Sequence, residues 1–376
     1  MLHTDTSAGN GARTAIPYGR QTIGDDDVAA VVDVLRGSWL TGGPTVARFE
    51  DALCCVTDAR HAVAFSNGTA ALHAALWAAG IGSGDRVVTS PLSFVASANC
   101  ARYVDATPSF VDIDRATLNL DPSLVGPCDA LVAVHYAGLP VDLTRLATRP
   151  RVIVEDAAHA LGARTPDGPV GNCAHSDLCT FSFHPVKAIT TGEGGAVTTN
   201  SDELAARLRQ FRSHGIVPRP DAPGEGGWYY EVETLGFNYR ITDVQCALGV
   251  SQLAKLSRFV MRRNELADRY RVLLAGMPGV ELPPAADAGW RHAYHLFPVR
   301  VPDRRRVYDE LRAAGIGVQV HYVPIYRHPL YADSGVTCAE FPETERAYAG
   351  LLSLPMFPSL TDDDQDRVVE LLATAT

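Results

Sequence analysis

The chain offers only two side-chain amines for chemistry. Of its 33 basic residues, two are lysine, Lys187 and Lys255, and the other 31 are arginine. Lys187 lies in the stretch FSFHPVKAITTGEGGA, and no other formally charged residue occurs between Asp177 and Glu193. A lysine in such an apolar, turn-rich segment is expected to be partly desolvated, which lowers its pKa and makes the amine available as a nucleophile. The sequence therefore marks Lys187 as a candidate Schiff-base lysine.

Lys255 has different surroundings. It lies in a stretch that we expect to be helical, close to Ser251, Gln252 and Arg258. Polar neighbours of this kind are typical of a solvated helix face. We therefore interpret Lys255 as a surface residue without a special role, and the scarcity of lysine as a compositional bias towards arginine.

A second candidate site is Ser66-Asn67-Gly68-Thr69, between a predicted strand at 61–65 and a predicted helix at 69–79. A helix N-terminus presents free N–H groups and a favourable dipole to an anion such as a phosphate, and Gly68 lets the backbone approach the anion closely. An ordinary helix N-cap explains the same residues equally well. The segment matches neither a Walker A motif nor a G-x-G-x-x-G motif.

A third candidate is a carboxylate after a strand. The segment VIVEDAAHALGA places Asp156 just past a predicted strand at 151–154, with His159 three residues later. Ligands of parallel sheets bind beyond the carboxyl ends of the strands, where a carboxylate can pair with a protonated ring nitrogen of a cofactor. The alternative is that Asp156 is a helix N-cap.

An aromatic side chain completes the set of candidates. Phe94 follows the predicted strand at 86–90, in the segment TSPLSFVASAN. Its ring could stack on a planar ligand ring. Packing in the hydrophobic core is the alternative for an isolated aromatic residue.

These candidates need a scaffold that gathers strand ends, and the hydrophobic pattern predicts one. Short strands that are apolar throughout, rather than alternating, are typical of a mostly parallel α/β sheet covered on both faces. The predicted strands are 61–65, 86–90, 108–112, 130–135, 151–154, 178–183 and 195–199, and the predicted helices are 25–36, 69–79 and 94–103. The candidate residues would thus lie at the carboxyl ends of one sheet.

The pattern changes after about residue 240. The amphipathic stretch 241–275 predicts one long helix, and the remainder predicts a smaller α+β domain. Its predicted strands include 293–300 and 317–322, and its predicted helices are 303–314 and 362–373. The Gly/Pro-rich piece 215–228 is interpreted as a surface loop.

The composition excludes several classes of protein. Hydrophobic residues make up 46% of the 376 residues and charged residues 20%, which excludes a disordered chain. The formal net charge of -10 argues against binding to nucleic acid or to a membrane surface. The eight cysteines form no C-x-x-C pair, so we expect reduced thiols and no metal. No apolar run approaches the roughly 18 residues of a membrane span, and the N-terminus lacks a signal-peptide core, so we expect a cytoplasmic protein.

The candidates form a coherent set. A phosphate-binding helix N-terminus, a stacking aromatic, a carboxylate and a Schiff-base lysine occur in the order expected of an enzyme that uses pyridoxal 5'-phosphate (PLP). With these residues the chain resembles the DegT/DnrJ family of sugar aminotransferases over residues 17–375. The segments that carry the resemblance are IPYGRQTIGDDD, SNGTAALHAAL, SPLSFVASANC, VEDAAHALGA, FSFHPVKAITTGEGGA, FRSHGI, GFNYRITDVQCALGVSQL, VQVHYVPIY and LSLPMFPSLTDDDQ.

The resemblance implies a fold and an assembly. The fold would be fold type I, the aspartate aminotransferase-like α/β fold, with a mostly parallel central sheet and a smaller C-terminal α+β domain. We expect a flexible N-terminal tail at 1–16, a large PLP-binding domain at 17–250 and a small domain at 251–376. The active unit would be a homodimer whose subunits share their active sites.

The resemblance also assigns residues to PLP. Lys187 would hold the cofactor as a Schiff base and act as general acid/base, while the cofactor alternates with its pyridoxamine phosphate form. Asp156 would pair with the pyridine nitrogen, and His159 would lie beside the ring oxygen, where relatives often have Gln. The other cofactor-binding residues would be Phe94 on the ring face and, at the phosphate, Gly68, Thr69, Ser182 and the partner subunit's Asn238. The sugar-nucleotide site would be lined by Tyr18, Ser38, Trp39, Leu40, Thr41, His321 and Tyr322.

Within the family, FSFHPVKAITTGEGG, FRSHGI and VQVHYVPIY are most similar to the UDP-4-amino-4,6-dideoxy-N-acetyl-β-L-altrosamine transaminases of pseudaminic acid biosynthesis. This implies amino transfer from L-glutamate to the C4 keto group of UDP-2-acetamido-2,6-dideoxy-β-L-arabino-hex-4-ulose. The Ala/Arg-rich composition leaves open another 4-keto, or a 3-keto, sugar nucleotide of secondary metabolism or glycan synthesis. Lysine at position 187, where related dehydratases have His, argues against dehydration.

Two alternatives come from other functional classes. A family member that has lost catalysis could act as a regulator or scaffold, but the intact Lys187 and Asp156 argue against it. A nucleotide-binding oxidoreductase would need a dinucleotide fingerprint, which the sequence lacks.

Overall fold

The computed structural model describes residues 14–376, apart from the side chains of residues 333 and 334. Most of the predicted N-terminal tail, residues 1–13, lies outside the described residues. Ile16, also in that prediction, is buried, and its N–H donates to the carbonyl oxygen of Gly315 at 2.9 Å. The chain is therefore ordered from before residue 17, and these first residues pack against the C-terminal part of the molecule.

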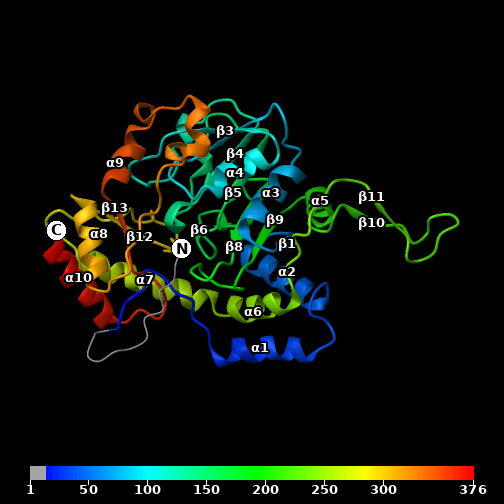
Figure 1. Cartoon of the computed structure of the whole chain (residues 1–376), viewed down its shortest axis with the longest axis horizontal. Coiled ribbons are helices and arrows are strands. Elements are labelled where there is room, and N and C mark those ends of the chain that lie inside the picture. Colours follow the sequence, from blue (N-terminus) through cyan, green and yellow to red (C-terminus); the bar gives the residue numbers. More distant parts are fainter. Residues whose placement is uncertain (1–13) are drawn as a thin grey trace.

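A seven-stranded sheet forms the centre of the molecule, in the order β1-β9-β8-β5-β4-β2-β3 (Figure 1). Its neighbouring strands are parallel except where β9 pairs with β1 and β8. The mostly parallel sheet predicted from the apolar runs is confirmed. The strands are β1 (His61–Phe65), β2 (Arg86–Thr89), β3 (Thr107–Phe110), β4 (Ala130–Val134), β5 (Val152–Asp156), β8 (Leu178–Ser182) and β9 (Gly195–Thr199).

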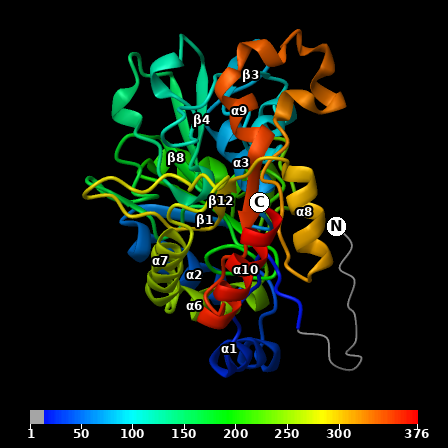
Figure 2. The ribbon, with the colours of Figure 1, turned by 90° about the vertical axis from the view of Figure 1, so that its left-hand side faces the viewer.

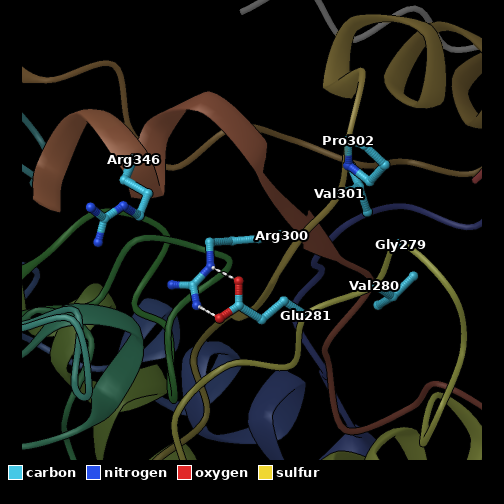
Figure 3. A pocket seen from close by; sticks show the side chains of 7 residues that line it. All are labelled: Gly279, Val280, Glu281, Arg300, Val301, Pro302 and Arg346. Carbon is cyan, nitrogen blue, oxygen red and sulfur yellow. Dashed lines mark hydrogen bonds and ion pairs between the residues drawn. The ribbon is translucent and has the colours of Figure 1, made fainter.

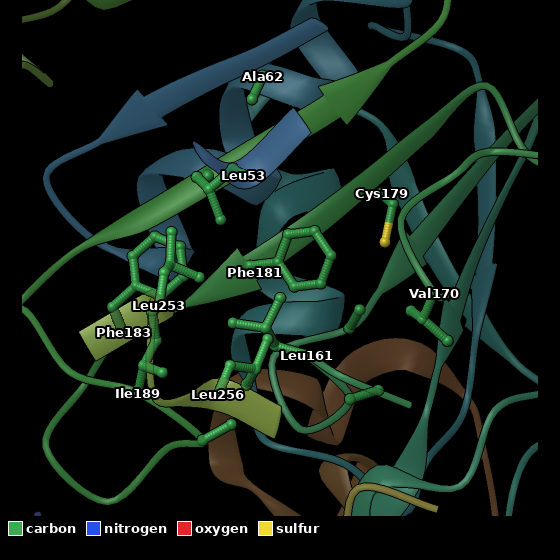
Figure 4. Close-up of a cluster of buried hydrophobic side chains, with 14 of the residues drawn as sticks. Leu53, Ala62, Leu161, Val170, Cys179, Phe181, Phe183, Ile189, Leu253 and Leu256 are labelled. Atoms are coloured by element: carbon green, nitrogen blue, oxygen red, sulfur yellow. The ribbon is translucent and has the colours of Figure 1, made fainter. Parts of the chain in front are cut away.

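Helices cover both faces of this sheet. Ala62 and Ala64 of β1 pack in one hydrophobic cluster, and Val63 and Phe65 pack in another on the opposite face. Figure 4 shows side chains of the first cluster gathered around Phe181 of β8. Burial on both faces explains why the strands are apolar throughout instead of alternating. The helices of this part are α1 (Asp25–Arg36), α2 (Pro44–Thr57), α3 (Gly68–Ala78), α4 (Ala96–Tyr103) and α5 (Asp202–Arg212).

The predicted single helix at 241–275 is wrong, because two helices occupy this stretch. They are α6 (Asp243–Leu253) and α7 (Leu256–Leu273), and they are separated at Ala254 and Lys255. Helix α7 packs with the C-terminal residues around a separate hydrophobic cluster, which supports our proposal of a small domain after about residue 250. Figure 2 shows the C-terminal helices grouped beside the central sheet.

The C-terminal part has less strand than its sequence predicts. A two-stranded antiparallel sheet joins β12 (Phe297–Arg300) to β13 (Leu351–Leu354), with α8 (Arg304–Ala313), α9 (Pro342–Gly350) and α10 (Asp362–Ala375) around it. The predicted strand at 293–300 is shortened because Tyr294 adopts a left-handed backbone, with φ of 45°. The predicted strand at 317–322 is wrong, since Gln319 forms an isolated bridge to Ser353 and the chain then turns into the candidate site.

The piece 215–228 is more ordered than the predicted surface loop. Strands β10 (Ile216–Pro218) and β11 (Tyr230–Val232) pair as an antiparallel hairpin that projects from the body of the molecule (Figure 1). Trp228 near its tip is 79% exposed. A second small hairpin pairs β6 (Arg164–Thr165) with β7 (Gly168–Pro169). None of the helices within residues 14–376 is long and apolar enough to cross a membrane.

Lys255 is not the solvated residue that the sequence suggested. Its Nζ lies 2.6 Å from Asp26 Oδ1 and 2.7 Å from Asp27 Oδ2, and only 11% of its side chain is exposed. Asp27 is fully buried and also accepts hydrogen bonds from Ser251 Oγ at 2.6 Å and Gln252 Nε2 at 2.8 Å. The prediction failed because helix α1, which carries both aspartates, packs against the α6–α7 corner. Lys255 therefore ties the N-terminal helix to the body of the protein.

Replacing Lys255 by Met should lower the free energy of unfolding by about 3 kcal/mol, because the buried carboxylate of Asp27 loses its cation. Asp26→Asn is the matched control, since the Asp26 side chain is 61% exposed. It should cost much less than the loss of Lys255, because water screens the charge of an exposed carboxylate. Urea denaturation followed by circular dichroism at pH 7 measures both losses. Small and equal losses would show that Lys255 does act as a surface residue.

Candidate active site

Lys187 lies in the loop that follows β8. The loop is closed at its base because Phe183 N–H donates to Gly194 O at 2.9 Å and Thr191 N–H donates to Phe183 O at 3.0 Å. Burial lowers the pKa of Lys187 to about 8, while the charge of Asp156 acts in the opposite direction. A substantial fraction of the amine is then uncharged near neutral pH, as a nucleophile requires. The desolvation predicted from the sequence is present in the structure.

Asp156 is the last residue of β5, whereas the sequence placed it just after the strand. It lies in register with Val134 of β4 and Thr180 of β8, so it sits in the middle of the sheet at its carboxyl edge. Its Oδ2 accepts a hydrogen bond from Ser97 Oγ at 2.6 Å, and its Oδ1 accepts one from Ala158 N–H at 3.2 Å. The segment after Asp156 is a turn, so the alternative of a helix N-cap is wrong. The carboxylate is held in a fixed orientation.

His159 lies in that turn and has one nitrogen without a partner. Its Nε2 is 3.1 Å from the Tyr322 hydroxyl, whereas its Nδ1 is buried and has no hydrogen-bond partner among the described residues. Burial, followed by the charge of Lys187, lowers the pKa of His159 well below its ordinary value. The imidazole is therefore neutral at pH 7. A buried, unsatisfied polar atom of this kind is expected to bind a ligand.

Residues from both ends of the chain join this group. The rings of Tyr18 and His321 lie 5.3 Å apart, and those of Phe94 and Tyr322 lie 6.0 Å apart. His321 Nδ1 is 2.9 Å from Ser353 Oγ. Burial, followed by the charge of Lys187, lowers the pKa of His321 to about 3. Phe94 is half exposed, as expected of a ring that covers a ligand and not of a core residue.

The residues of the predicted anion site lie at the start of α3 and at the end of β8. Asn67 caps the helix by accepting from Ala70 N–H at 2.9 Å, so the N-cap interpretation is confirmed. Capping leaves the N–H groups of Gly68 and Thr69, which have no acceptor within the helix. A Cβ at position 68 would lie 2.9 Å from the Cβ of Ser182 at the end of β8. Glycine here lets the helix start approach Ser182, and the three predicted residues meet.

The exposed segment Ser38–Thr41 is anchored elsewhere. Thr41 forms a bridge with Thr242, and Asp243 N–H donates to Leu40 O at 3.0 Å. Asn238, a few residues earlier, is also exposed and forms a bridge with Ser213. These residues lie on the surface of one chain, so their predicted roles in binding remain proposals.

The sequence did not single out several residues of the site. Ser93 and Ser97 form a hydrogen-bonded pair, 2.8 Å apart, behind Asp156. Ser97 lies in the first turn of α4 and Ser93 lies before the helix, so a spacing of four residues was the only signal in the sequence. His295 and Arg263 carry no such signal, since their neighbours are distant in sequence and are set by tertiary packing.

The side chains present fit PLP. Lys187 supplies a desolvated amine, Asp156 an oriented carboxylate, and His159 an unpaired imidazole nitrogen. The start of α3 beside Ser182 supplies donors for a phosphate, in a space that a side chain at position 68 would fill. Within residues 14–376, no cluster of three or more His, Cys, Asp or Glu side chains is arranged to hold a metal ion.

A separate cavity of about 440 Å³ lies in the C-terminal part (Figure 3). Its two arginines are already neutralised by glutamates. Arg300 forms a two-pronged ion pair with Glu281, and Arg346 lies 2.8 Å from Glu343. The cavity therefore offers no free charge to a substrate, in contrast to the surroundings of Lys187.

Comparison with known proteins agrees with this site. The model of the DegT/DnrJ/EryC1/StrS aminotransferase family matches residues 21–373. The chain is 38% identical over 374 residues to the spore coat polysaccharide biosynthesis protein SpsC of Bacillus subtilis, covering 94% of this chain and 95% of SpsC.

Two solved structures are similar over nearly the whole chain. Spr1654 from Streptococcus pneumoniae in its PMP form has a TM-score of 0.89 and 28% identity, covering 96% of this chain and 98% of that one. Helicobacter pylori PseC, an aminotransferase involved in the biosynthesis of pseudoaminic acid, has a TM-score of 0.86 and 29% identity, covering 96% of this chain and 99% of that one.

In the cofactor-free protein, Lys187 should react with an acylating reagent at half its maximal rate near pH 8, the pKa that burial gives it. Lys255 should need a higher pH, because hydrogen bonds to Asp26 and Asp27 outweigh its burial and raise its pKa. The chain has no other lysine, so peptide mass spectrometry reads the two sites separately. Equal reactivity of the two lysines at pH 8 would contradict the prediction.

Proposed function

Because the chain belongs to the DegT/DnrJ/EryC1/StrS aminotransferase family, we propose that it transfers the amino group of L-glutamate to the C4 keto group of a nucleotide-linked 4-keto-6-deoxy sugar. Its class is that of its structural neighbours, the PLP-dependent sugar aminotransferases. The observation that carries the proposal is the desolvated amine of Lys187 at the same sheet edge as the oriented carboxylate of Asp156.

Lys187 has two tasks in this proposal. PLP, when bound, supplies an electrophilic carbon for an amine and a ring that accepts electrons. Lys187 Nζ is the group that would hold PLP through that carbon. When it is free, Nζ would accept the proton from the Cα of glutamate and, in the second half-reaction, would donate a proton to the sugar C4. A pKa of about 8 suits both directions, because it lies close to a physiological pH.

Asp156 and the serines behind it set the charge of the site. The carboxylate would face the pyridine nitrogen of bound PLP and would favour a proton there by charge attraction. Ser97 donates to Oδ2, and Ser93 lies next to Ser97, so the carboxylate cannot rotate freely. A fixed acceptor acts without reorganisation during the reaction.

The neutral histidines and tyrosines shape the substrate space. His159 and His321 carry no charge at pH 7, because burial and Lys187 lower the pKa of each. His159 Nδ1 is free to donate to the ring oxygen of the cofactor or accept from it. Tyr18 and Tyr322 present aromatic surfaces on which a sugar ring can rest, and Phe94 would cover a face of the cofactor ring.

We also propose a homodimer with shared sites. Gly68, Thr69 and Ser182 would hold the phosphate within one chain, and the exposed Asn238 of the other chain would complete the set. Large apolar side chains that are exposed in a single chain support a second copy. Three of these are Trp39, which is 58% exposed, Trp228 at 79% and Leu235 at 81%.

The best candidate for the sugar is UDP-2-acetamido-2,6-dideoxy-β-L-arabino-hex-4-ulose. Two findings support it: the similarity to PseC, and the sequence ITTGEGG after Lys187, which resembles branches that aminate C4. The similarity to SpsC supports the broader class of sugars for cell-surface polysaccharides. Another 4-keto or a 3-keto sugar nucleotide is the alternative.

A turnover screen should identify the sugar. We expect 2-oxoglutarate to be released from L-glutamate when a UDP-linked 4-keto-6-deoxy sugar is present, and at a much lower rate with a 3-keto isomer. Lys187→Ala is the control. Loss of the lysine should abolish both turnover and the visible band of the bound cofactor while the protein stays folded. Turnover with the 3-keto isomer alone would show that the enzyme aminates C3 of the sugar and not C4. Activity in Lys187→Ala would remove Lys187 from the mechanism.

The shared site can be tested by mixing variant subunits at a PLP concentration too low to load the Asn238→Ala protein. Asn238→Ala should weaken PLP binding by about tenfold, the effect of one lost hydrogen bond to a charged group. Mixed dimers of Asn238→Ala and Lys187→Ala chains should recover activity, because one of their two sites has both residues. The crossed control mixes wild type with the Lys187→Ala/Asn238→Ala double variant, whose mixed dimers should have no intact site. Activity in purified mixed dimers of the crossed control, without recovery in purified mixed dimers of the first mixture, would place Asn238 in its own subunit's site.

A further inference from the structure

The chain enters the molecule through a strap that lies against the loop of Lys187. This N-terminal strap, residues 16–24, precedes α1 and belongs to none of the helices and sheets described above. A Cβ at Gly19 would lie 3.5 Å from the Cβ of Val186, the residue before Lys187. Residues 20–22 line one narrow cavity together with Lys187. The strap therefore packs directly on the loop that carries the amine.

The first half of the strap is held by the C-terminal part of the chain. Gly317 N–H donates to Ile16 O at 2.6 Å, and Met356 N–H donates to Tyr18 O at 3.0 Å. These bonds leave the ring of Tyr18 at 5.3 Å from the ring of His321, in the candidate active site. Tyr18 is thus the residue through which the strap reaches the site.

The second half of the strap is held by the side chain of Gln252 in α6. Its Nε2 donates to Thr22 O at 3.0 Å and to Asp27 Oδ2 at 2.8 Å, so the two acceptors use both N–H groups of the amide. Gln252 is 1% exposed and lines the same cavity as Lys187. Within residues 14–376, no other hydrogen bond joins residues 19–23 to the rest of the chain.

Neighbours of Gln252 bind the same carboxylate but do not contact the strap. Ser251 Oγ donates to Asp27 Oδ1 at 2.6 Å, and Lys255 Nζ lies 2.7 Å from Asp27 Oδ2. The carboxylate is therefore held firmly, and it holds the amide of Gln252 in turn. Only the bond from Gln252 to Thr22 O carries this fixed arrangement into the strap.

We propose that Gln252 is a positioning residue of the aminotransferase reaction, which fixes the strap so that Tyr18 meets the sugar nucleotide in a set position. The inference rests on the proposed function, in which Tyr18 lines the sugar-nucleotide site. Gln252 acts through Thr22 and the strap and does not touch the reacting atoms. A strap that is displaced for part of the time lowers the apparent affinity for the sugar nucleotide in proportion to that time.

The glutamate half-reaction should depend far less on the strap. Asp156 is held by the sheet and by Ser97, and the loop of Lys187 is closed by its own backbone hydrogen bonds at Phe183. None of these contacts involves Gln252. Loss of its amide should therefore change binding of the sugar nucleotide and leave the reaction with glutamate intact.

Kinetics of the two half-reactions test this separation. Gln252→Met, which keeps the length of the side chain without its amide, should raise KM for the UDP-linked 4-keto-6-deoxy sugar by about tenfold. The kcat, and the rate at which L-glutamate bleaches the visible band of the bound cofactor, should stay within about twofold of wild type. Ser251→Ala is the matched control, because it removes a hydrogen bond to Asp27 and leaves Thr22 untouched. It should leave KM within about twofold of wild type.

A double-mutant cycle shows whether the effect passes through Tyr18. In a Tyr18→Ala chain, Gln252→Met should change kcat/KM by less than about twofold, because the strap no longer carries the ring. A full tenfold loss in that background would show that Gln252 acts by another route and would overturn the proposal.

Proteolysis of the folded holoenzyme reads the strap without any substrate. Arg20 is exposed, so trypsin can cut the bond between Arg20 and Gln21 when the strap leaves the loop. Cleavage should be about tenfold faster in Gln252→Met than in wild type, because cleavage follows the population of the open form. Ser251→Ala should be cut at the wild-type rate. Mass spectrometry identifies the new N-terminus at Gln21.

Further results would reject the role of Gln252. An unchanged KM in Gln252→Met contradicts it, and so does an equal increase in Ser251→Ala, which would trace the effect to Asp27 in general. If Gln252→Met loses the near-ultraviolet circular dichroism of the folded protein, Gln252→Asn takes its place with the same expectation. Its amide is one methylene too short to reach Thr22 O and Asp27 together.

The two readouts also separate this inference from the proposed function. Faster cleavage at Arg20 in an enzyme whose KM is unchanged would reject the role of Gln252 alone. Absence of turnover in the wild type with every sugar nucleotide of the screen would reject the proposed function, whatever the rate of cleavage.

Discussion

Burial of one lysine amine beside one carboxylate is the constraint that organises this molecule. Desolvation pulls the pKa of Lys187 down to about 8, and the charge of Asp156 pulls it up. The amine keeps this pKa only if both groups have fixed positions and water is kept away from them. The sheet does so for Asp156, whose neighbours in β4 and β8 are paired in register with it. The closed loop after β8 brings Lys187 to the same edge, so the charge of Asp156 acts on the amine although the two residues are not adjacent in sequence.

The rest of the site keeps water and other charges away from the Lys187 amine. His159 and His321 are polar enough to bind ligands, yet burial and Lys187 lower their pKa values so far that they stay neutral. His295, whose ring lies 4.4 Å from that of His159 and whose pKa is also lowered by burial, extends this arrangement into the C-terminal part of the chain. There, the buried Arg263 and the strained Tyr294 fix the backbone. The surroundings of the amine thus depend also on the packing of residues that do not touch it.

The two lysines show how tertiary surroundings give one side-chain type opposite properties. At Lys187, desolvation outweighs the charge of Asp156, and the pKa of the amine falls. Lys255 forms short contacts with Asp26 and Asp27, and its pKa rises despite burial. The first arrangement makes an amine reactive, and the second makes it a fixed charge that joins α1 to the α6–α7 corner. Arginine could not take the first role, because its guanidinium stays protonated.

The sequence by itself determined the local chemistry and the class of fold. Apolar strand runs predicted a mostly parallel sheet, and the residue types around Lys187, Asp156 and Gly68 predicted an amine, a carboxylate and an anion site at its edge. The tertiary structure decided what depends on contacts between distant segments. The break in the helix at Lys255, the ion pair with Asp27, and the meeting of His295 with His159 were invisible in the pattern. Local propensity depends on neighbours in the chain, whereas burial, pKa and strain depend on neighbours in space.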